Sequence, residues 1–417
     1  MSKTFKLAAV AAVCAAAAGA HAQDSVFSEQ VEAAVKKTIA ENTIQFGGYL
    51  RGGFFSADKG MPKGGYALGG DLQKYRLGNE GDNYIEVMLG KTWNNNGVKT
   101  GAFYMPKVYN GASGTAQLYG TISGMSFAPE ATFWGGQRYH RIADVHIVDK
   151  WVMEDGDNYG AGIDDVKLGV LDATLNVALH SDTNFDNNLS VNNAKRVNAQ
   201  VRNISVNPGG KLTLTAGVVD GTFNQGSAGG AVGLMHKQTD FLVGGLNNML
   251  MLQSSTGHAN LSGKFYNLGN GAGLAGAGAK QNRVLDSIDW QVGAFGGQAL
   301  VGYQTTTPDN SVKTTDLSVG GRVSYAIHQN VKLLGDVGVT SREIDGQARQ
   351  RLNKATVAVA FSPDGKFWTR PEFRLYATRA NWNTAADTAN AALATPTFGG
   401  QGKSNANTIG AQMEYWF

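Results

Sequence analysis

The chain has 417 residues, of which 42% are hydrophobic and only 17% are charged, with 56 glycines, 8 prolines and a single cysteine. This composition excludes a disordered chain and predicts at least one sizeable folded body. The formal net charge is only +3, so bulk charge does not select a partner.

The first 22 residues predict a secretory signal peptide. Lys3 and Lys6 precede the apolar run LAAVAAVCAAAAGA, and AHA at 20–22 fits a cleavage site before Gln23. Cys14 lies inside this run, so the mature chain is expected to have no cysteine and no disulfide chemistry. Without the two lysines, 34 basic residues face 33 acidic ones, and this balance argues against nucleic-acid binding.

Residues 23–45 differ from everything that follows. Val31, Val35 and Ile39 recur every four residues, which predicts a short helical or linker segment ahead of the main body. After residue 22 no stretch approaches the roughly 20 apolar residues of a spanning helix. The mature chain is therefore either a periplasmic or secreted globule or, if it lies in a membrane, a closed β-barrel.

From residue 46 onward an alternation of period two dominates, and helical patterning is almost absent. TLNVALHS (174–181), KLTLTAGVVDG (211–221) and NKATVAVAFSPDG (353–365) each place apolar residues on one face and polar or small residues on the other. A β-sandwich would also alternate. The many strands with small residues on the polar face favour one large barrel with a wet interior over residues 46–417.

The last residues divide between two faces. Phe417, Tyr415 and Met413 share one face, which we expect to contact lipid and to end in an aromatic girdle. Trp416 falls on the other face with Glu414. The alternation therefore predicts that this tryptophan faces the barrel interior.

Other aromatic residues also fall on the inward face beside charges. Tyr49 neighbours Arg51 in QFGGYLRGGFF, and Tyr84 neighbours Glu86 in NYIEVMLG. In KFWTRPEFRLYAT the alternation places Phe367, Phe373 and Leu375 outward and Trp368, Arg370, Glu372, Arg374 and Tyr376 inward. Flat apolar rings beside hydrogen-bonding charges match a pyranose sugar, which has an apolar C–H face and an equatorial belt of hydroxyls. Each ring taken alone could equally fill barrel volume.

Seven collinear stretches resemble maltoporin and its sugar-porin relatives. They are YLRGG, QKYRLGNEGDNYIEVMLG, ATFWGGQRYHRIADVHIVDKW, GAGIDDV, VNPGGKLTL, FWTRPEFRLYAT and GAQMEYW, and together they extend from about residue 46 to 417. The resemblance implies an 18-stranded antiparallel transmembrane barrel that assembles as a homotrimer. It also implies a slide of lumen aromatics flanked by ionic tracks, with the third loop folded inward as the constriction.

The resemblance assigns roles to individual positions. The slide aromatics are Tyr49, Tyr84, Trp368 and Trp416. The polar tracks contain Arg51, Arg76, Glu86, Asp144 and Asp149. The family also has a loop arginine in this region, and Arg141 lies close to its position but out of register. Trp151 stands where the family has its constriction tyrosine. Two departures stand out: Leu246 is expected where the family has a slide phenylalanine, and the shortened 108–120 segment lacks the tryptophan that a neighbouring subunit contributes.

The implied function is facilitated passive diffusion of oligosaccharides across the outer membrane of a Gram-negative bacterium, in contact with lipid and lipopolysaccharide. We expect no enzymatic activity, cofactor, metal or nucleic acid. The alternatives are a general diffusion porin and a surface adhesin or phage receptor. The residues do not specify the sugar or its chain length.

Three further patterns point to other chemistry. GAGLAG (271–276) matches a dinucleotide-binding fingerprint, but it lies in a low-complexity run without a flanking strand and helix, so we expect a surface loop. His140 and His146 lie close to Asp144 and Asp149, which raises the alternative of a metal site, although the spacing matches no usual one. The acidic residues between 144 and 157 could supply a glycosidase pair, but a wide polar lumen would keep their carboxylates ionised.

Overall fold

The computed structural model describes residues 44–181, 194–221, 227–261, 280–308, 312–400 and 402–417, without the side chains of 154–158. The expected signal peptide, nearly all of the expected helical segment at 23–45 and the GAGLAG stretch lie outside the described residues. The first strand begins at Gln45, at the end of that segment.

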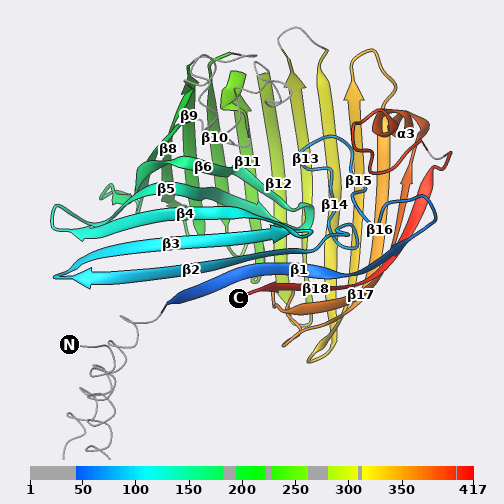
Figure 1. Cartoon of the computed structure of the whole chain (residues 1–417), viewed down its shortest axis with the longest axis horizontal. Coiled ribbons are helices and arrows are strands. Elements are labelled where there is room, and N and C mark those ends of the chain that lie inside the picture. The colour runs from blue at the N-terminus through cyan, green and yellow to red at the C-terminus, as the bar shows by residue number, and fades with distance from the viewer. Residues whose placement is uncertain (1–43, 182–193, 222–226, 262–279, 309–311, 401) are drawn as a thin grey trace, which may run out of the picture.

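Eighteen strands form the described body (Figure 1). They are β1 (Gln45–Ala57), β2 (Tyr84–Asn95), β3 (Val98–Tyr109), β4 (Ala112–Met125), β5 (Ala128–Val145), β6 (Lys150–Lys167), β7 (Thr174–Ser181), β8 (Lys195–Asn207), β9 (Gly210–Asp220), β10 (Gly229–Gln238), β11 (Leu246–Ser255), β12 (Lys280–Val292), β13 (Phe295–Thr307), β14 (Thr314–His328), β15 (Val331–Ile344), β16 (Gln350–Phe361), β17 (Glu372–Trp382) and β18 (Asn405–Trp416).

Helical structure in this part of the chain is confined to connections. It comprises the 3-10 turns η1 (His146–Val148) and η2 (Gly257–Ala259) and the helix α3 (Thr384–Ala391). Asn383 caps α3 by accepting a hydrogen bond from the Ala386 N–H at 3.1 Å. No helix among the described residues is long and apolar enough to cross a membrane.

The sheet closes on itself. Each strand pairs antiparallel with its neighbours in sequence, from β1 with β2 through to β17 with β18. The first strand also pairs with the last, with Tyr49 opposite Trp416 and Arg51 opposite Glu414. Figure 1 shows β1 and β18 side by side at this seam. The prediction of an all-β, 18-stranded antiparallel barrel is therefore confirmed, and closure leaves no unpaired edge.

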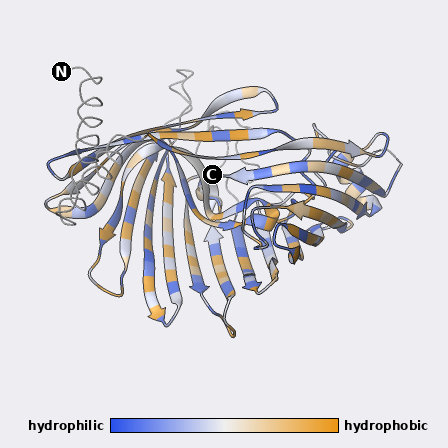
Figure 2. Cartoon of the chain, turned by 90° about the horizontal axis from the view of Figure 1, so that it is seen from below, coloured by the Kyte–Doolittle hydropathy of each residue, from blue (hydrophilic) through white to orange (hydrophobic). Residues whose placement is uncertain are grey.

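The strands keep the alternation that the sequence predicts, and it is visible as alternating bands in Figure 2. Leu179, Val218 and Val357 are exposed on the outer surface, whereas Thr174 and Thr213 are buried on the inner one. At the C-terminus, Phe417, Tyr415, Met413 and Ile409 point outward, and Glu414, Gln412 and Thr408 are buried inside. The outer face is therefore apolar toward lipid and the inner face is polar.

One hairpin leaves the wall and enters the lumen. β4 pairs with β5 only as far as Gln137, and β7 pairs with β6 only from Gly160. The stretch between them pairs with itself and carries η1 at its tip. There the Ile147 N–H donates to Gln298 Oε1 on β13 at 3.1 Å. This confirms that the expected loop folds inward.

A second inward segment was not expected. The connection 58–83, between β1 and β2, buries Tyr75 and Leu77 against the wall. The Thr356 hydroxyl donates to the carbonyl oxygen of Leu77 at 2.9 Å, and the Tyr75 hydroxyl is 3.1 Å from that of Ser318. A Cβ atom on Gly320 or Gly338 would collide with the Tyr75 ring, so these wall glycines make room for the connection.

The two inward segments and the wall share a small apolar core, and one outward prediction fails there. Phe367 is 2% exposed and packs in the cluster that contains Ile147 and Leu72, so it does not face lipid. Alternation holds only within a strand. β16 ends at Phe361 and β17 begins at Glu372, so Phe367 lies in a connection. Phe373 and Leu375, inside β17, face outward as predicted.

Candidate functional site

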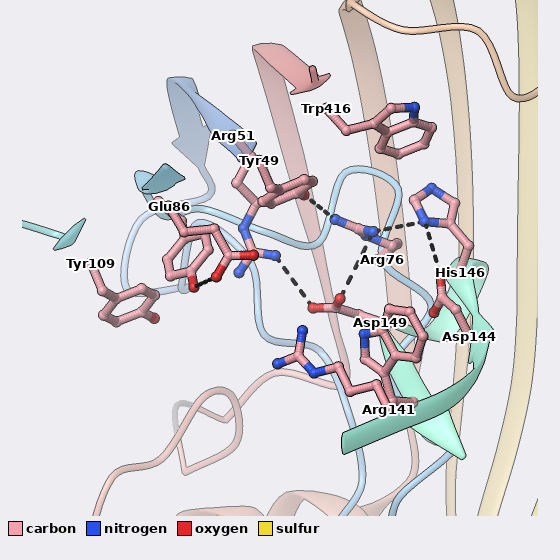
Figure 3. A pocket seen from close by; sticks show the side chains of 12 residues that line it. Tyr49, Arg51, Arg76, Glu86, Tyr109, Arg141, Asp144, His146, Asp149 and Trp416 are labelled. Atoms are coloured by element: carbon pink, nitrogen blue, oxygen red, sulfur yellow. Dashed lines mark hydrogen bonds and ion pairs between the residues drawn. The ribbon is translucent and has the colours of Figure 1, made fainter. Parts of the chain in front are cut away.

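A cavity of about 530 Å³ lies in the lumen between β1, β2, β18, the connection 58–83 and the hairpin tip. Its lining comprises Tyr49, Arg51, Arg76, Tyr84, Glu86, Tyr109, Arg141, Asp144, His146, Asp149, Trp151 and Trp416. Except for Trp368, every residue predicted for the slide, tracks and constriction lines this cavity. Figure 3 shows that they converge from different elements.

Aromatic rings follow one another along the cavity wall. The ring centroids of Tyr49 and Tyr84 are 6.0 Å apart, and those of Tyr84 and Tyr109 are 6.3 Å apart. Trp416 lies opposite Tyr49 in the β1–β18 register, which continues the row across the seam. The row offers apolar faces to a ligand over several ring widths.

Trp368 lies just beyond the cavity lining and is linked to it by a histidine. The His146 ring packs edge-on against Trp416 at 5.4 Å and contacts Trp368 at 5.5 Å. Trp368 itself is 37% exposed. The guanidinium of Arg370 covers the Trp416 ring at 4.4 Å, which fixes that ring from one side.

Arg76 holds the centre of the polar network. It lies 2.8 Å from a Glu414 oxygen and 3.1 Å from a Glu80 oxygen, and it donates to the Tyr49 hydroxyl. Arg76 Nη1 is also 3.0 Å from His146 Nδ1. These contacts lock both the guanidinium and the neighbouring Tyr49 ring in place.

A second arginine joins the hairpin to the connection 58–83. Arg51 forms a paired contact with Asp82 at 2.7 and 2.8 Å, and it reaches Glu80 at 3.0 Å and Asp149 at 3.3 Å. Because the guanidinium fork matches a carboxylate, the pair with Asp82 orients Arg51 toward the cavity.

The far end of the cavity combines a carboxylate with aromatic hydroxyls. The Tyr84 hydroxyl donates to Glu86 Oε2 at 2.6 Å, and the Tyr139 hydroxyl donates to the same oxygen at 2.9 Å. Arg141 stacks on Tyr139 at 3.7 Å and lies 5.4 Å from the Trp151 ring. Trp151 thus lines the cavity with a cation beside it.

Two ionisable groups of the hairpin tip are held in fixed charge states. Burial alone would raise the pKa of Asp149, but the neighbouring Arg76 and Arg51 outweigh it and hold that pKa below its usual range. Burial, reinforced by Arg76, lowers the pKa of His146 well below its usual range. The tip therefore carries an ionised aspartate and a neutral histidine at neutral pH.

Tyr109 and His146 line the cavity although neither was predicted to. Tyr109 pairs with Tyr84 across β2 and β3, on the inward side shared with Met105 and Lys107. The alternation test would have found Tyr109 had it been applied to this strand. His146 lies in a turn rather than a strand, so the alternation carries no signal for it.

The histidines considered for a metal site have different partners. His140 packs against Trp134 at 5.1 Å and His180 at 5.5 Å, whereas His146 packs against Trp368 and Trp416. Within the described ranges, no group of three or more His, Cys, Asp or Glu side chains is arranged to hold a metal ion.

The expected substitution of a slide phenylalanine by Leu246 is not supported. Leu246 begins β11 and shares its alternation with Leu250 and Leu252, which are exposed on the outer surface. Met249 is the buried inward residue nearest to it. The shortened connection after β3 is a two-residue turn at 110–111, which directly follows Tyr109.

The adjoining wall, from β14 to β18, carries buried charges that do not line the cavity. We call them the buried ladder: Arg322, Lys332, Lys354, Arg370, Arg374, Asp336, Glu372 and Glu414. Lys332 lies 2.6 Å from Glu372, and Arg370 lies 2.8 Å from Glu414, which Arg374 also contacts. The connection 58–83 and the hairpin tip cover this wall.

The sequence model of the family described as LamB porin matches residues 44–417. Solved structures similar to this chain include three from Pseudomonas aeruginosa. They are OpdQ, OccK5 (OpdH) and OccD3 (OpdP), each with a TM-score of 0.50 and each covering 90% of this chain. The sequence identities are 9%, 10% and 9%, and the matches cover 99%, 98% and 91% of those chains, in the same order. At such low identity the likeness shows the barrel fold alone.

Proposed function

The chain belongs to the LamB porin family, and from this premise we propose that it carries oligosaccharides by facilitated passive diffusion. Family and barrel make it a channel in the outer membrane of a Gram-negative bacterium, surrounded by lipid. What we propose beyond the family and the fold is that this channel is specific for sugars.

The observation that carries the proposal is the composition of the cavity wall. Rings of Tyr49, Tyr84, Tyr109 and Trp416 line the same space as the charges of Arg51 and other polar residues. A pyranose needs both kinds of surface, because its C–H face stacks on rings and its hydroxyls exchange hydrogen bonds with charged groups. A channel for small ions has no need of a row of rings.

The proposed mechanism is a passage between overlapping weak sites. A sugar ring would stack on one aromatic residue and move to the next while its hydroxyls exchange partners among Glu86, Arg51 and Asp149. Each position must bind strongly enough to recruit the sugar and weakly enough to release it. The mechanism needs no covalent step, metal or nucleotide. The family supports a homotrimeric assembly, which we include in the proposal.

The test is a sugar panel on single channels in a planar bilayer. We expect linear glucans, sucrose or β-glucosides of suitable length to block the ion current in a saturable way. Current without block by any of them would favour the general diffusion porin. Binding of cells or phage through the external loops, combined with an absence of sugar block, would favour the adhesin or receptor. Shorter products after incubation with maltodextrin would overturn a purely passive role.

A further inference from the structure

Arg322, on β14, has unmet hydrogen-bonding capacity in the interior. Its side chain is 1% exposed, and its Nε lies 3.1 Å from Asp336 Oδ2. Within the described part of the chain, neither Nη1 nor Nη2 has an acceptor. Buried donors without acceptors are costly, and charged ones are the most costly. The free side of this guanidinium is a planar fork of N–H groups that suits an anion.

The carboxylate beside Arg322 does not balance the local charge. Asp336 Oδ1 also accepts from Lys354 Nζ at 2.8 Å, so one carboxylate serves two buried cations. The buried ladder as a whole has five cations and three carboxylates. Nearby charges do not remove this excess, because they occur as ion pairs: Arg76 pairs with Glu80, and Arg342 pairs with Asp316. An uncompensated positive charge in the interior is destabilising.

The surroundings of the fork are closed and partly apolar. The Tyr75 ring covers Gly320, two residues before Arg322 on the same face, and Phe367 covers Gly296, which lies opposite Ser324 in the β13–β14 register. The hydroxyl of Ser324, two residues after Arg322, is fully buried and likewise has no partner among the described residues. Two unmet donors thus share one face of β14 where water is largely excluded and electrostatic attraction is strong.

We propose that a small monovalent inorganic anion, chloride under natural conditions, binds at the Arg322 fork with the Ser324 hydroxyl as a further donor. One negative charge balances the excess of the Arg322, Asp336 and Lys354 group. Sulfate and phosphate bring more charge and need more donors than this enclosed place supplies. The site is separate from the sugar cavity and does not depend on the proposed function.

The site is next to the point where the hairpin tip is attached to the wall. Gln298 lies opposite Arg322 in the β13–β14 register and accepts the hydrogen bond from the hairpin tip at Ile147. The anion therefore stabilises the stretch of wall that supports the tip.

Two measurements on the purified full-length channel in detergent test the proposal. Bromide replaces chloride in such sites and scatters anomalously, so crystals soaked in sodium bromide should show an anomalous peak beside Nη1 and Nη2 of Arg322. Separately, the unfolding temperature is measured as chloride replaces gluconate at constant ionic strength. It should rise with chloride concentration, because an anion that binds only the folded state stabilises it.

Matched variants separate the site from general salt effects. Arg322→Gln should remove the peak and the chloride dependence, whereas Arg349→Gln should leave both unchanged, because Arg349 is exposed and pairs with Glu343. If Arg322→Gln does not fold, Ser324→Ala should weaken the apparent chloride affinity severalfold. No peak at Arg322, or a peak without any chloride dependence of unfolding, would overturn the proposal.

Discussion

Two sides of the same lumen carry the same kinds of side chain and use them differently. Around β1, β2 and β18, arginines and carboxylates such as Arg51 and Glu86 stand among tyrosines at the edge of an open cavity. Around β14–β17 and at Glu414 on β18, the buried ladder has similar residues closed off beneath the connection 58–83 and the hairpin tip. Strand alternation decides which residues point inward. The segments that fold over the wall decide which of those residues can meet a ligand.

The largest effect should come from the covered side. Asp336→Asn would leave Arg322 and Lys354 without their shared carboxylate, so we expect a loss of about 3–5 kcal/mol in unfolding free energy. Denaturant unfolding of the purified protein measures it. Glu343→Gln, in an exposed pair with Arg349, is the control and should cost about 0–1 kcal/mol. Equal costs for the two variants would show that burial does not make the ion pairs of the ladder more costly to break than an exposed pair.

On the open side, the effect should fall on sugar binding. Trp416→Ala and Trp368→Ala should each weaken current block by about 1–2 kcal/mol, roughly 5- to 30-fold in the block constant, because each removes a stacking face. The matched control is Phe54→Ala, an aromatic residue on the outer face that is 67% exposed. Unchanged block in both tryptophan variants would remove these residues from the slide.

A smaller effect should locate the end of the aromatic row. Tyr109→Ala should weaken block by about 1 kcal/mol, roughly 5-fold, because one ring is lost but the neighbouring Tyr84 remains. Tyr104→Ala, on the outward side of the same strand, should have no effect. If the two variants behave alike, the row ends at Tyr84.

The smallest effect concerns pH, and His146 and Asp149 of the hairpin tip are expected to contribute no change. The pKa of His146 lies below its usual value near 6.5, so it stays neutral as pH falls from 7.5 to 5.5. The pKa of Asp149 is also below its usual value, so its ion pairs are present throughout this range and are lost only at more acidic pH. Asp144 of the same hairpin also lines the cavity, and burial raises its pKa to about 7, so its carboxylate takes up a proton over this range. In an Asp144→Asn variant, which removes that titration, sugar block measured at both pH values should agree. A several-fold difference would mean that the tip changes its charge state.

The sequence predicts the parts of the site that lie within strands, because lipid outside and water inside impose one pattern. Tyr49, Tyr84 and Trp416 follow directly from it, and Tyr109 would have followed by the same test. The pattern fails for Phe367, because a connection has no alternation.

The inward path of the connection 58–83 could not be predicted either. Tyr75 fits the lumen because Gly320 and Gly338, far away in the sequence, leave space for its ring. That complementarity depends on the strand register and becomes visible only in the folded barrel.

The contact between the two inward segments has a kinetic consequence. The Arg76 N–H donates to the Ile147 carbonyl oxygen at 2.9 Å, and Arg51 and Arg76 both reach Asp149, so each segment braces the other. A ligand entering between them meets groups that are already in position and loses little free energy in ordering them. Fast capture then needs no tight binding, and release can remain rapid, which is what sets the throughput of a pore.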